Sequence, residues 1–201
     1  MPVHGLFPTP VGFYELDVLT EEQRDWIVGQ PLISNMGNRV SADKHLLDAD
    51  IMGPVRSQIE TAISEFCTEA LSAAPDFKLK ITQSWCNYTT TGESHHKHHH
   101  PNSLVSGVYY PQTAPGDSIN FFNGSLYADS FDVSPTGYNQ FNSDEWNVPT
   151  PQDSLILFPS TLRHEVSPRQ STGLDRISLS FNTFFAEDFG ADERMTRVRF
   201  S

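Results

Sequence analysis

The sequence predicts one mainly β domain, a sandwich or small barrel with α-helices packed outside it. The length of 201 residues suits a single domain with one core. Fourteen prolines and fourteen phenylalanines indicate a turn-rich, aromatic-rich fold rather than a helical bundle. Helical periodicity is confined to the first 76 residues, and short strand-like segments follow it. We expect residues 1–76 to form a helical support and residues 77–185 to form the β core.

Two helices are predicted in the N-terminal part. Thr20 followed by Gln23 has the form of a capping box, which predicts a helix over 21–28 that ends before Gly29. The second helix is indicated by apolar residues at steps of three and four, and it is expected to end at Pro75. These apolar residues are Val55, Ile59, Ile63, Phe66 and Ala70.

Six segments after Pro75 have the length and composition of strands. Each is bounded by Pro, Gly, Asn or Asp, and the first alternates apolar and polar residues. They cover residues 77–90, 103–110, 117–124, 153–159, 163–168 and 176–185. The segment 127–151 is rich in Asn, Ser, Asp and Gly, so we expect a long loop insertion there, of the kind that often forms a lid.

The charge balance disfavours several partners. Thirteen basic and 25 acidic residues give a net charge of −12, which argues against nucleic acid or an anionic membrane as a partner. No run of about 18 apolar residues is present, and the N-terminus does not resemble a signal peptide. We expect Cys67 and Cys86 to be reduced and the protein to be cytoplasmic.

The segment TGESHHKHHHPNSLVSGVYY, residues 91–110, holds five of the eight histidines within six positions. It is internal, it is interrupted by Lys97, and it leads into a predicted strand, so it is not a purification tag. In an extended chain His96, His98 and His100 share one face, and two imidazoles two residues apart form a chelating pair. A solvated polar loop is the alternative interpretation.

A third ligand for such a pair is expected at His164. This histidine follows the apolar strand 155–158 and a turn at Pro159. His4 and His45 lie outside the strand region and are expected to be structural or exposed.

Arg176 is the candidate anchor for an anion. It begins the segment RISLSFN, and Ser178 lies on the same face of that predicted strand. An arginine fork beside a hydroxyl is suited to binding a carboxylate through two hydrogen bonds. The alternative is an arginine that is exposed or paired with Asp175 or Asp188.

These segments together resemble the 2-oxoglutarate- and Fe(II)-dependent oxygenases, most of all a small group from bacteria and marine phages. The resemblance covers nearly the whole chain and is carried by WCNYTTTGE, HPNSLVSGVYY, LILFPSTLRHEVSP and RISLSFN. It implies a double-stranded β-helix, a flattened barrel of two antiparallel sheets with the metal at its mouth. It also implies a dioxygenase that uses O2 to convert 2-oxoglutarate into succinate and CO2 while it hydroxylates an unactivated C–H bond.

The resemblance further implies roles for particular residues. Iron(II) would be held by His98, His100 and His164, and the far carboxylate of 2-oxoglutarate would lie against Arg176 and Ser178. Asn87 or Tyr88, together with Tyr109, would reach the co-substrate, and aromatic residues would exclude water, namely Trp85, Tyr109 and Phe122. The prime substrate is expected to be a peptide or protein, particularly a basic one, modified on proline, asparagine or a similar side chain. A small metabolite is the alternative.

The sequence departs from the family pattern at one position. Members usually supply His-x-Asp or His-x-Glu before the distal histidine, and no such pair occurs here. We therefore expect three histidine ligands, with one positive charge more at the site than in the usual arrangement. The competing ligand set is His100 and His164 with Asn102 or water in place of the carboxylate.

Two rival classes of protein share the predicted barrel. A cupin-type metal-dependent dioxygenase or isomerase would use the spacing of Gly92, His98 and His100, but it would lack its acidic ligand and leave Arg176 without a role. A viral structural or carbohydrate-binding jelly roll with a structural zinc would need a fourth ligand, and Cys86 is the only cysteine near the histidines.

Overall fold

A computed structural model describes residues 3–17, 19–124 and 134–200. Its helices are α1 (Glu21–Val28) and α2 (Gly53–Leu71). The strands are β1 (Gly12–Glu15), β2 (Leu32–Ser34), β3 (Arg39–Ser41), β4 (Leu79–Thr89), β5 (His95–His98), β6 (Val105–Gln112), β7 (Ser118–Phe122), β8 (Glu145–Pro149), β9 (Ser154–Pro159), β10 (Arg163–Val166) and β11 (Arg176–Phe185). Short 3-10 turns precede α2 at Leu46–Asp48 and Asp50–Met52, and another lies near the C-terminus at Asp192–Arg194.

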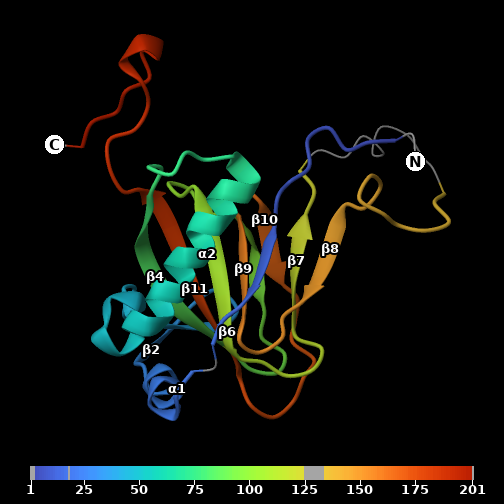
Figure 1. Ribbon diagram of the computed structural model, residues 1–201. Helices are drawn as coiled ribbons and strands as arrows, with labels where there is room; N and C mark the ends of the chain where they lie inside the picture. The colour runs from blue at the N-terminus through green and yellow to red at the C-terminus, as the bar shows by residue number, and fades with distance from the viewer. Residues whose placement is uncertain (1–2, 18, 125–133, 201) are drawn as a thin grey trace.

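The strands form two facing antiparallel sheets (Figure 1). The larger sheet has the order β1-β9-β6-β11-β4-β3-β2, and the smaller has the order β5-β10-β7-β8. From β4 to β11 the chain passes repeatedly between the two sheets, so that β4, β6, β9 and β11 lie in the larger sheet and β5, β10 and the hairpin β7–β8 lie in the smaller one. This winding is a double-stranded β-helix, and the predicted fold class is confirmed.

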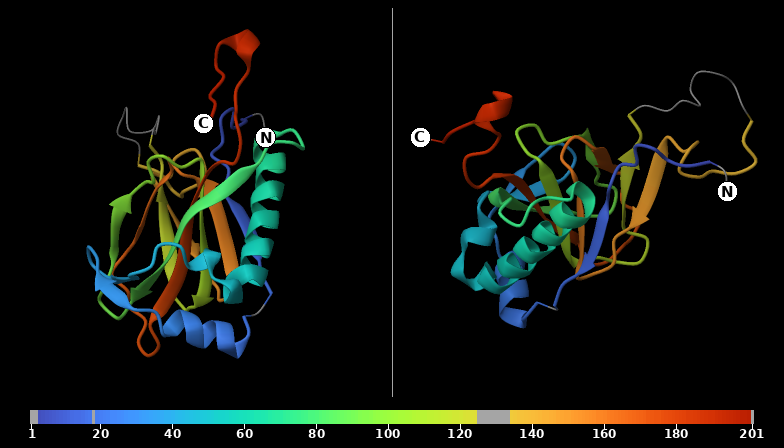
Figure 2. Two further views of the ribbon diagram at one scale, coloured as in Figure 1. Left: turned by 90° about the vertical axis from the view of Figure 1, so that its left-hand side faces the viewer. Right: turned by 45° about the horizontal axis from the view of Figure 1, so that its top comes forward.

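The N-terminal part covers and extends the larger sheet. Thr20 and Gln23 form the predicted capping box at the start of α1. Helix α2 runs along the outer face of the larger sheet (Figure 2) and ends at Leu71 rather than Pro75, because Ser72 adopts a left-handed conformation. The predicted support is not purely helical, since β1 extends one edge of this sheet and β3 and β2 extend the other.

The larger sheet is buried on both faces. Its outer face packs against the helices through a core that includes Ile59, Phe66, Tyr109 and Leu157. Its inner face meets the smaller sheet in a second core of Val108, Tyr110, Ile119, Phe121, Val148, Ile156 and Phe158. The central strands therefore lack a simple alternation of apolar and polar residues.

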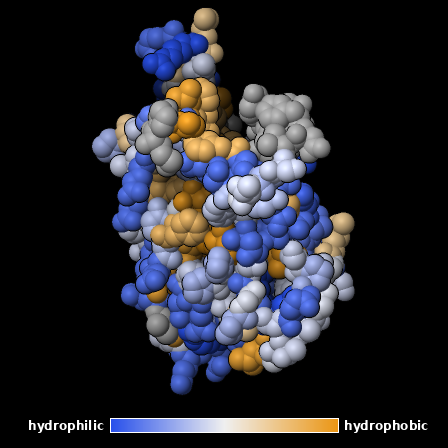
Figure 3. All heavy atoms as spheres, turned by 90° about the vertical axis from the view of Figure 1, so that its right-hand side faces the viewer, coloured by the Kyte–Doolittle hydropathy of each residue, from blue (hydrophilic) through white to orange (hydrophobic). Residues whose placement is uncertain are grey.

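The smaller sheet has a polar outer side, and the molecular face on that side is largely hydrophilic (Figure 3). On β7 and β8 the Asn147 amide donates to Ser118 Oγ (2.8 Å) and to Asn120 Oδ1 (2.6 Å).

Strand β8 corrects the prediction of an uninterrupted loop over 127–151. Residues 127–133 of that predicted insertion lie outside the described residues.

Two further expectations concern cysteines and membranes. Cys67 and Cys86 are both buried and unpaired with each other, as expected. Among the described residues, no helix is long and apolar enough to cross a membrane.

Candidate active site

The histidine-rich segment forms β5 at the edge of the smaller sheet. It pairs antiparallel with β10, so that His98 lies opposite His164 and His95 lies opposite Val166. Between these two pairs β5 has two residues, His96 and Lys97, where β10 has one, Glu165, which is a β-bulge. The expected alternation is wrong for this reason: His95 lines the pocket with His98, whereas His96 is exposed.

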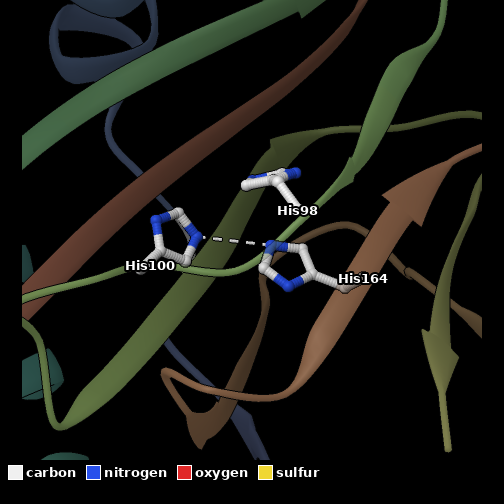
Figure 4. A group of neighbouring side chains, drawn as sticks. All are labelled: His98, His100 and His164. Carbon is white, nitrogen blue, oxygen red and sulfur yellow. Dashed lines mark hydrogen bonds between the residues drawn. The ribbon is translucent and has the colours of Figure 1, made fainter. Parts of the chain in front are cut away.

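The bulge and the turn that follows bring three imidazoles together (Figure 4). One ring nitrogen from each of His98, His100 and His164 lies within 4.8 Å of the others. His100 Nε2 and His164 Nε2 are 3.3 Å apart, the contact drawn as a dashed line. His100 lies just after β5 and is fixed by its backbone N–H, which donates to the Ser160 carbonyl (2.9 Å). The structure therefore assembles the three histidines that the sequence suggested.

Backbone carbonyls orient two of these rings. His98 Nδ1 lies 2.7 Å from the His96 carbonyl, and His164 Nδ1 lies 3.0 Å from the Leu162 carbonyl. A neutral ring that donates from Nδ1 leaves Nε2 unprotonated, which is the form that binds a metal. Because His164 then carries its proton on Nδ1, His100 is the donor in the contact between their Nε2 atoms. Cation binding by His100 through Nε2 requires its proton to move to Nδ1.

The electrostatics keep the histidines neutral. Burial, with smaller contributions from the neighbouring histidines, lowers the pKa of His164 to about 3 and that of His100 to about 4. Burial also lowers the pKa of His98. His95 behaves in the same way, with a pKa of about 3. At neutral pH the cluster therefore offers uncharged imidazole donors.

The pocket around these rings lies between the two sheets. Its lining comes from both sheets and from the β2–β3 turn: Asn38, Trp85, Asn87, His95, His98, His100, Val108, Tyr110, Ile119, His164, Val166, Arg176, Ser178 and Ser180. His95 lies among these side chains, and its ring stacks on that of His98 with 4.5 Å between the ring centres.

Arg176 and Ser178 lie in this pocket on β11, and Asn87 lies in it on β4. Arg176 is only 2% exposed, and its guanidinium lies 5.1 Å from the centre of the Tyr110 ring. Among the described residues no carboxylate forms an ion pair with Arg176, whereas the buried Arg169 is paired with Asp117 at 2.9 Å. A buried guanidinium without a counter-ion is costly unless an anionic ligand binds it.

Most of the unpaired polar groups of the interior gather in the same place. Five buried side-chain atoms of the described residues have no hydrogen-bond partner, and four of the five belong to residues that line this pocket. These four are Asn38 Nδ2, Asn87 Oδ1, Tyr110 Oη and Arg176 Nε. Since native proteins pair nearly all buried polar groups, this concentration indicates a site built for a polar ligand.

Some predicted site residues lie elsewhere. Tyr109 is on the opposite face of β6 and donates to Asp153 Oδ1 (3.0 Å), so its assignment to the co-substrate was wrong. Tyr88 also faces outward and donates to the Ile27 carbonyl. Phe122 is outside the pocket, with the Lys97 ammonium 3.2 Å from its ring centre. Trp85 lines the pocket as expected.

The alternative ligand and the two histidines expected to be structural or exposed are also outside the site. Asn102, the alternative ligand, is exposed on the turn after His100 with a φ of 57° and does not line the pocket. His4 is exposed, and His45 bridges to Ser84 in the backbone.

Of the polar lining residues, sequence reasoning missed four: Tyr110, His95, Asn38 and Ser180. The inward position of Tyr110 follows once Tyr109 is placed on the outer face of the sheet, because adjacent residues of a strand face opposite sides. The bulge that turns His95 inward leaves no sequence signal, and Asn38 reads as an ordinary turn residue.

Comparison with known proteins places this site within a family. Residues 83–182, which contain the three histidines and Arg176, match the family model described as "Putative 2OG-Fe(II) oxygenase". A search among curated proteins found no match.

Solved structures share the fold at low sequence identity. A 2OG-Fe(II) oxygenase family oxidoreductase from Burkholderia pseudomallei is 14% identical over 81% of this chain and 75% of its own, with a TM-score of 0.54. A Pseudomonas putida prolyl-4-hydroxylase is 17% identical over 87% of this chain and 92% of its own, also with a TM-score of 0.54. HygX from Streptomyces hygroscopicus, solved with nickel and 2-oxoglutarate, is 13% identical over 86% of this chain and 82% of its own (TM-score 0.54).

Proposed function

The chain belongs to the 2-oxoglutarate- and Fe(II)-dependent oxygenases, and from this premise we propose that it hydroxylates an unactivated C–H bond of a peptide or protein. The observation that supports the proposal best is the joining of two features in one pocket. Three neutral imidazoles lie close enough to one another to bind one cation, and a buried guanidinium without a carboxylate partner lies in the same lining.

The donor set fits iron(II). Imidazole nitrogen suits late first-row metals, and three ligands on one side leave coordination positions for a co-substrate and oxygen. In this proposal His98, His100 and His164 hold the metal. When bound, the iron supplies oxygen activation, which converts 2-oxoglutarate and O2 into succinate and CO2 and oxidises the prime substrate. The protein positions the reactants and shields them from water with Trp85 and the apolar residues of the pocket.

The other half of the pocket fits a dicarboxylate. Arg176 is the proposed partner of the carboxylate remote from the metal, and Ser178 shares its face of β11. Tyr110 supplies a further donor, because burial raises the pKa of its hydroxyl to about 12 and keeps it protonated. Asn87 is held by its amide, which donates to Ser180 Oγ (3.0 Å), and its own oxygen remains available to an N–H or O–H group of the substrate.

The reaction and the prime substrate are the finer part of the proposal. Both prolyl-4-hydroxylase and an epimerase, SnoN from nogalamycin biosynthesis, are among the similar folds. We favour a peptide or protein substrate carrying basic residues, because the net charge of the chain is −12. A small metabolite is the second candidate. We place the enzyme in the cytoplasm, in keeping with its two free cysteines.

A titration and a turnover assay test this function. Wild-type protein with Fe(II) and 2-oxoglutarate, without oxygen, should develop a weak visible charge-transfer band, and air should then release succinate. Arg176→Ala should weaken 2-oxoglutarate binding on the order of 100-fold, because a buried charged partner is lost, and it should leave Mn(II) affinity unchanged.

The matched control is Arg194→Ala, which removes an exposed arginine that does not line the pocket and should change neither affinity. Indifference of the wild-type protein to 2-oxoglutarate would contradict the proposal and favour the cupin-type alternative. Unchanged 2-oxoglutarate affinity in Arg176→Ala would show that the anchor lies elsewhere.

A further inference from the structure

One of the four unpaired polar atoms in the pocket comes from outside the barrel. Asn87, Tyr110 and Arg176 belong to strands that the family match covers, residues 83–182. Asn38 belongs to the turn between β2 and β3, yet it is 5% exposed and its Nδ2 has no partner. An N-terminal segment therefore completes a pocket whose other parts are all in the core fold.

The sheet register places Asn38 in line with Arg176. Val40 pairs with Asn87, and Asn87 pairs with Ser178, so these three side chains form one row across β3, β4 and β11. Both pairings are antiparallel, which makes β3 run in the same direction as β11. Asn38 lies two residues before Val40 and Arg176 two residues before Ser178, so both face the pocket from the next row. Two strand spacings separate their backbones, roughly 10 Å.

The hairpin that carries Asn38 is fastened on both sides of the pocket. Arg39 Nη2 forms an ion pair with Asp175 Oδ2 (2.8 Å), directly beside Arg176. On the other side, the Ser94 N–H donates to the Gly37 carbonyl (3.0 Å), directly before His95. Gly37 has a φ of +92°, and a Cβ there would lie 2.8 Å from the Ser94 carbonyl oxygen. The close approach of the turn to the histidine strand therefore requires glycine.

The Asn38 amide is oriented before any ligand arrives. Asn35 Nδ2 donates to Asn38 Oδ1 (3.0 Å), which occupies the oxygen side of the group. The NH2 side is left facing the pocket as a buried donor with no acceptor. Together with Arg176 Nε and Tyr110 Oη it makes a set of three donors, and a carboxylate has about four lone-pair positions to receive them.

We propose that Asn38 donates a hydrogen bond to the C5 carboxylate of 2-oxoglutarate, the same carboxylate that Arg176 anchors. This inference rests on the proposed function and adds a specificity-determining residue to it. The alignment with Arg176 assigns Asn38 to the C5 end rather than to the end bound at the histidines. Asn38 thereby favours five-carbon dicarboxylates over 2-oxo acids that lack the second carboxylate.

The test compares two ligands on Mn(II)-loaded, full-length protein by calorimetric titration without oxygen. The ligands are 2-oxoglutarate and 2-oxopentanoate, which lacks the C5 carboxylate. Asn38→Ala should weaken 2-oxoglutarate binding on the order of tenfold, as expected for a hydrogen bond to a charged group, and leave 2-oxopentanoate binding unchanged. Asn38→Asp, nearly isosteric but anionic, should weaken 2-oxoglutarate binding more than Asn38→Ala does.

Ser34→Ala is the control, since Ser34 is exposed on the same hairpin. It should behave as the wild type, and all variants should keep wild-type Mn(II) affinity. Equal losses for the two ligands, or no loss in either Asn38 variant, would overturn the assignment of Asn38 while the proposed function stands. Failure of the wild-type protein to bind 2-oxoglutarate would overturn both.

Discussion

Two adjacent tyrosines on β6 have different roles, because one faces the helices and the other faces the pocket. Tyr109 and Tyr110 are both fully buried on β6, but they face opposite sides of the larger sheet. The Tyr109 hydroxyl donates to Asp153, which also receives Arg24 Nη2 at 3.2 Å. The Tyr110 hydroxyl has no partner and faces the pocket beside Arg176.

Removing each hydroxyl should therefore have a different consequence. Tyr109→Phe should lower the free energy of unfolding by about 1 kcal/mol, the typical net value of a hydrogen bond, and leave 2-oxoglutarate affinity unchanged. Tyr110→Phe should reduce 2-oxoglutarate affinity without a loss of stability, because it removes a buried hydroxyl that is unpaired in the absence of ligand. Urea unfolding and ligand titration measure the two effects. The same pattern in both variants would contradict this division of roles.

The sequence predicted the residues with special chemistry better than the residues that surround them. His98, His100, His164, Arg176 and Ser178 stand out by type and spacing, and the structure brings all five to one pocket. The face on which Tyr109 lies was not predictable, because β6 is buried on both sides and its pattern shows no alternation. Asn38 reaches the pocket only through long-range strand pairing.

At the scale of elements, the connections between strands are held by a buried ion pair. Asp117 precedes β7 and Arg169 follows β10, and their side chains meet at 2.9 Å with 1% and 2% exposure. The backbone of Arg169 also bonds to Gly92 and Glu93, in the connection that leads to the histidine strand. This pair therefore joins three connections at the end of the barrel.

Breaking this pair should be severely destabilising. Asp117→Asn leaves a buried guanidinium without its counter-ion, at a cost of about 3–5 kcal/mol in the free energy of unfolding. The matched control is Asp192→Asn, which disrupts an exposed contact to Arg199 at 3.8 Å and should have little effect. Chemical denaturation of the two variants compares them directly. Similar small losses in both would show that the buried pair contributes no more than an exposed one.

The same pair predicts a pH dependence. Burial alone raises the pKa of Asp117, but hydrogen bonds from Arg169 and from the Ala114 N–H outweigh it, so the pKa lies below the ordinary 3.8. The stabilisation is thus complete above pH 3.8 and is lost as the pH falls through the lower pKa of the folded state. Below pH 3.8 the free energy of unfolding should fall more steeply with decreasing pH in the wild type than in Asp117→Asn.

Helices and strands were predicted correctly where a local sequence pattern marks them. They were missed where only pairing with other strands stabilises them. Helix α1 was marked by its capping box, and α2 by its apolar spacing. Strand β8 was missed, because Val148 is its only buried residue and it follows a polar segment. The strands β1, β2 and β3 are three or four residues long and gain their stability from the sheet edges that they extend.

At the scale of the whole molecule, the two halves of the proposed site belong to different sheets. The histidines lie on the smaller sheet and the connection after β5, whereas Arg176, Ser178 and Asn87 lie on the larger sheet. The resemblance implied the barrel, but the sequence showed no division of the site between the sheets, because that division follows from strand order. A metal held by the histidines alone binds one sheet. A ligand that reaches from the metal to Arg176 connects the two.

Metal and 2-oxoglutarate should therefore stabilise the fold cooperatively. Mn(II) alone should raise the melting temperature modestly, and 2-oxoglutarate alone should raise it little, because Arg176 is then its main contact. Together they should raise it by more than the sum of the two shifts, with 2-oxoglutarate at 100 times its dissociation constant adding about 2.7 kcal/mol. Arg176→Ala should keep the shift caused by Mn(II) and lose most of the additional shift caused by 2-oxoglutarate. Thermal unfolding of each protein without ligand, with each ligand alone and with both measures these shifts. Strictly additive shifts in the wild type would mean that the two ligands bind independently, and no molecule bridging the sheets could then be the co-substrate.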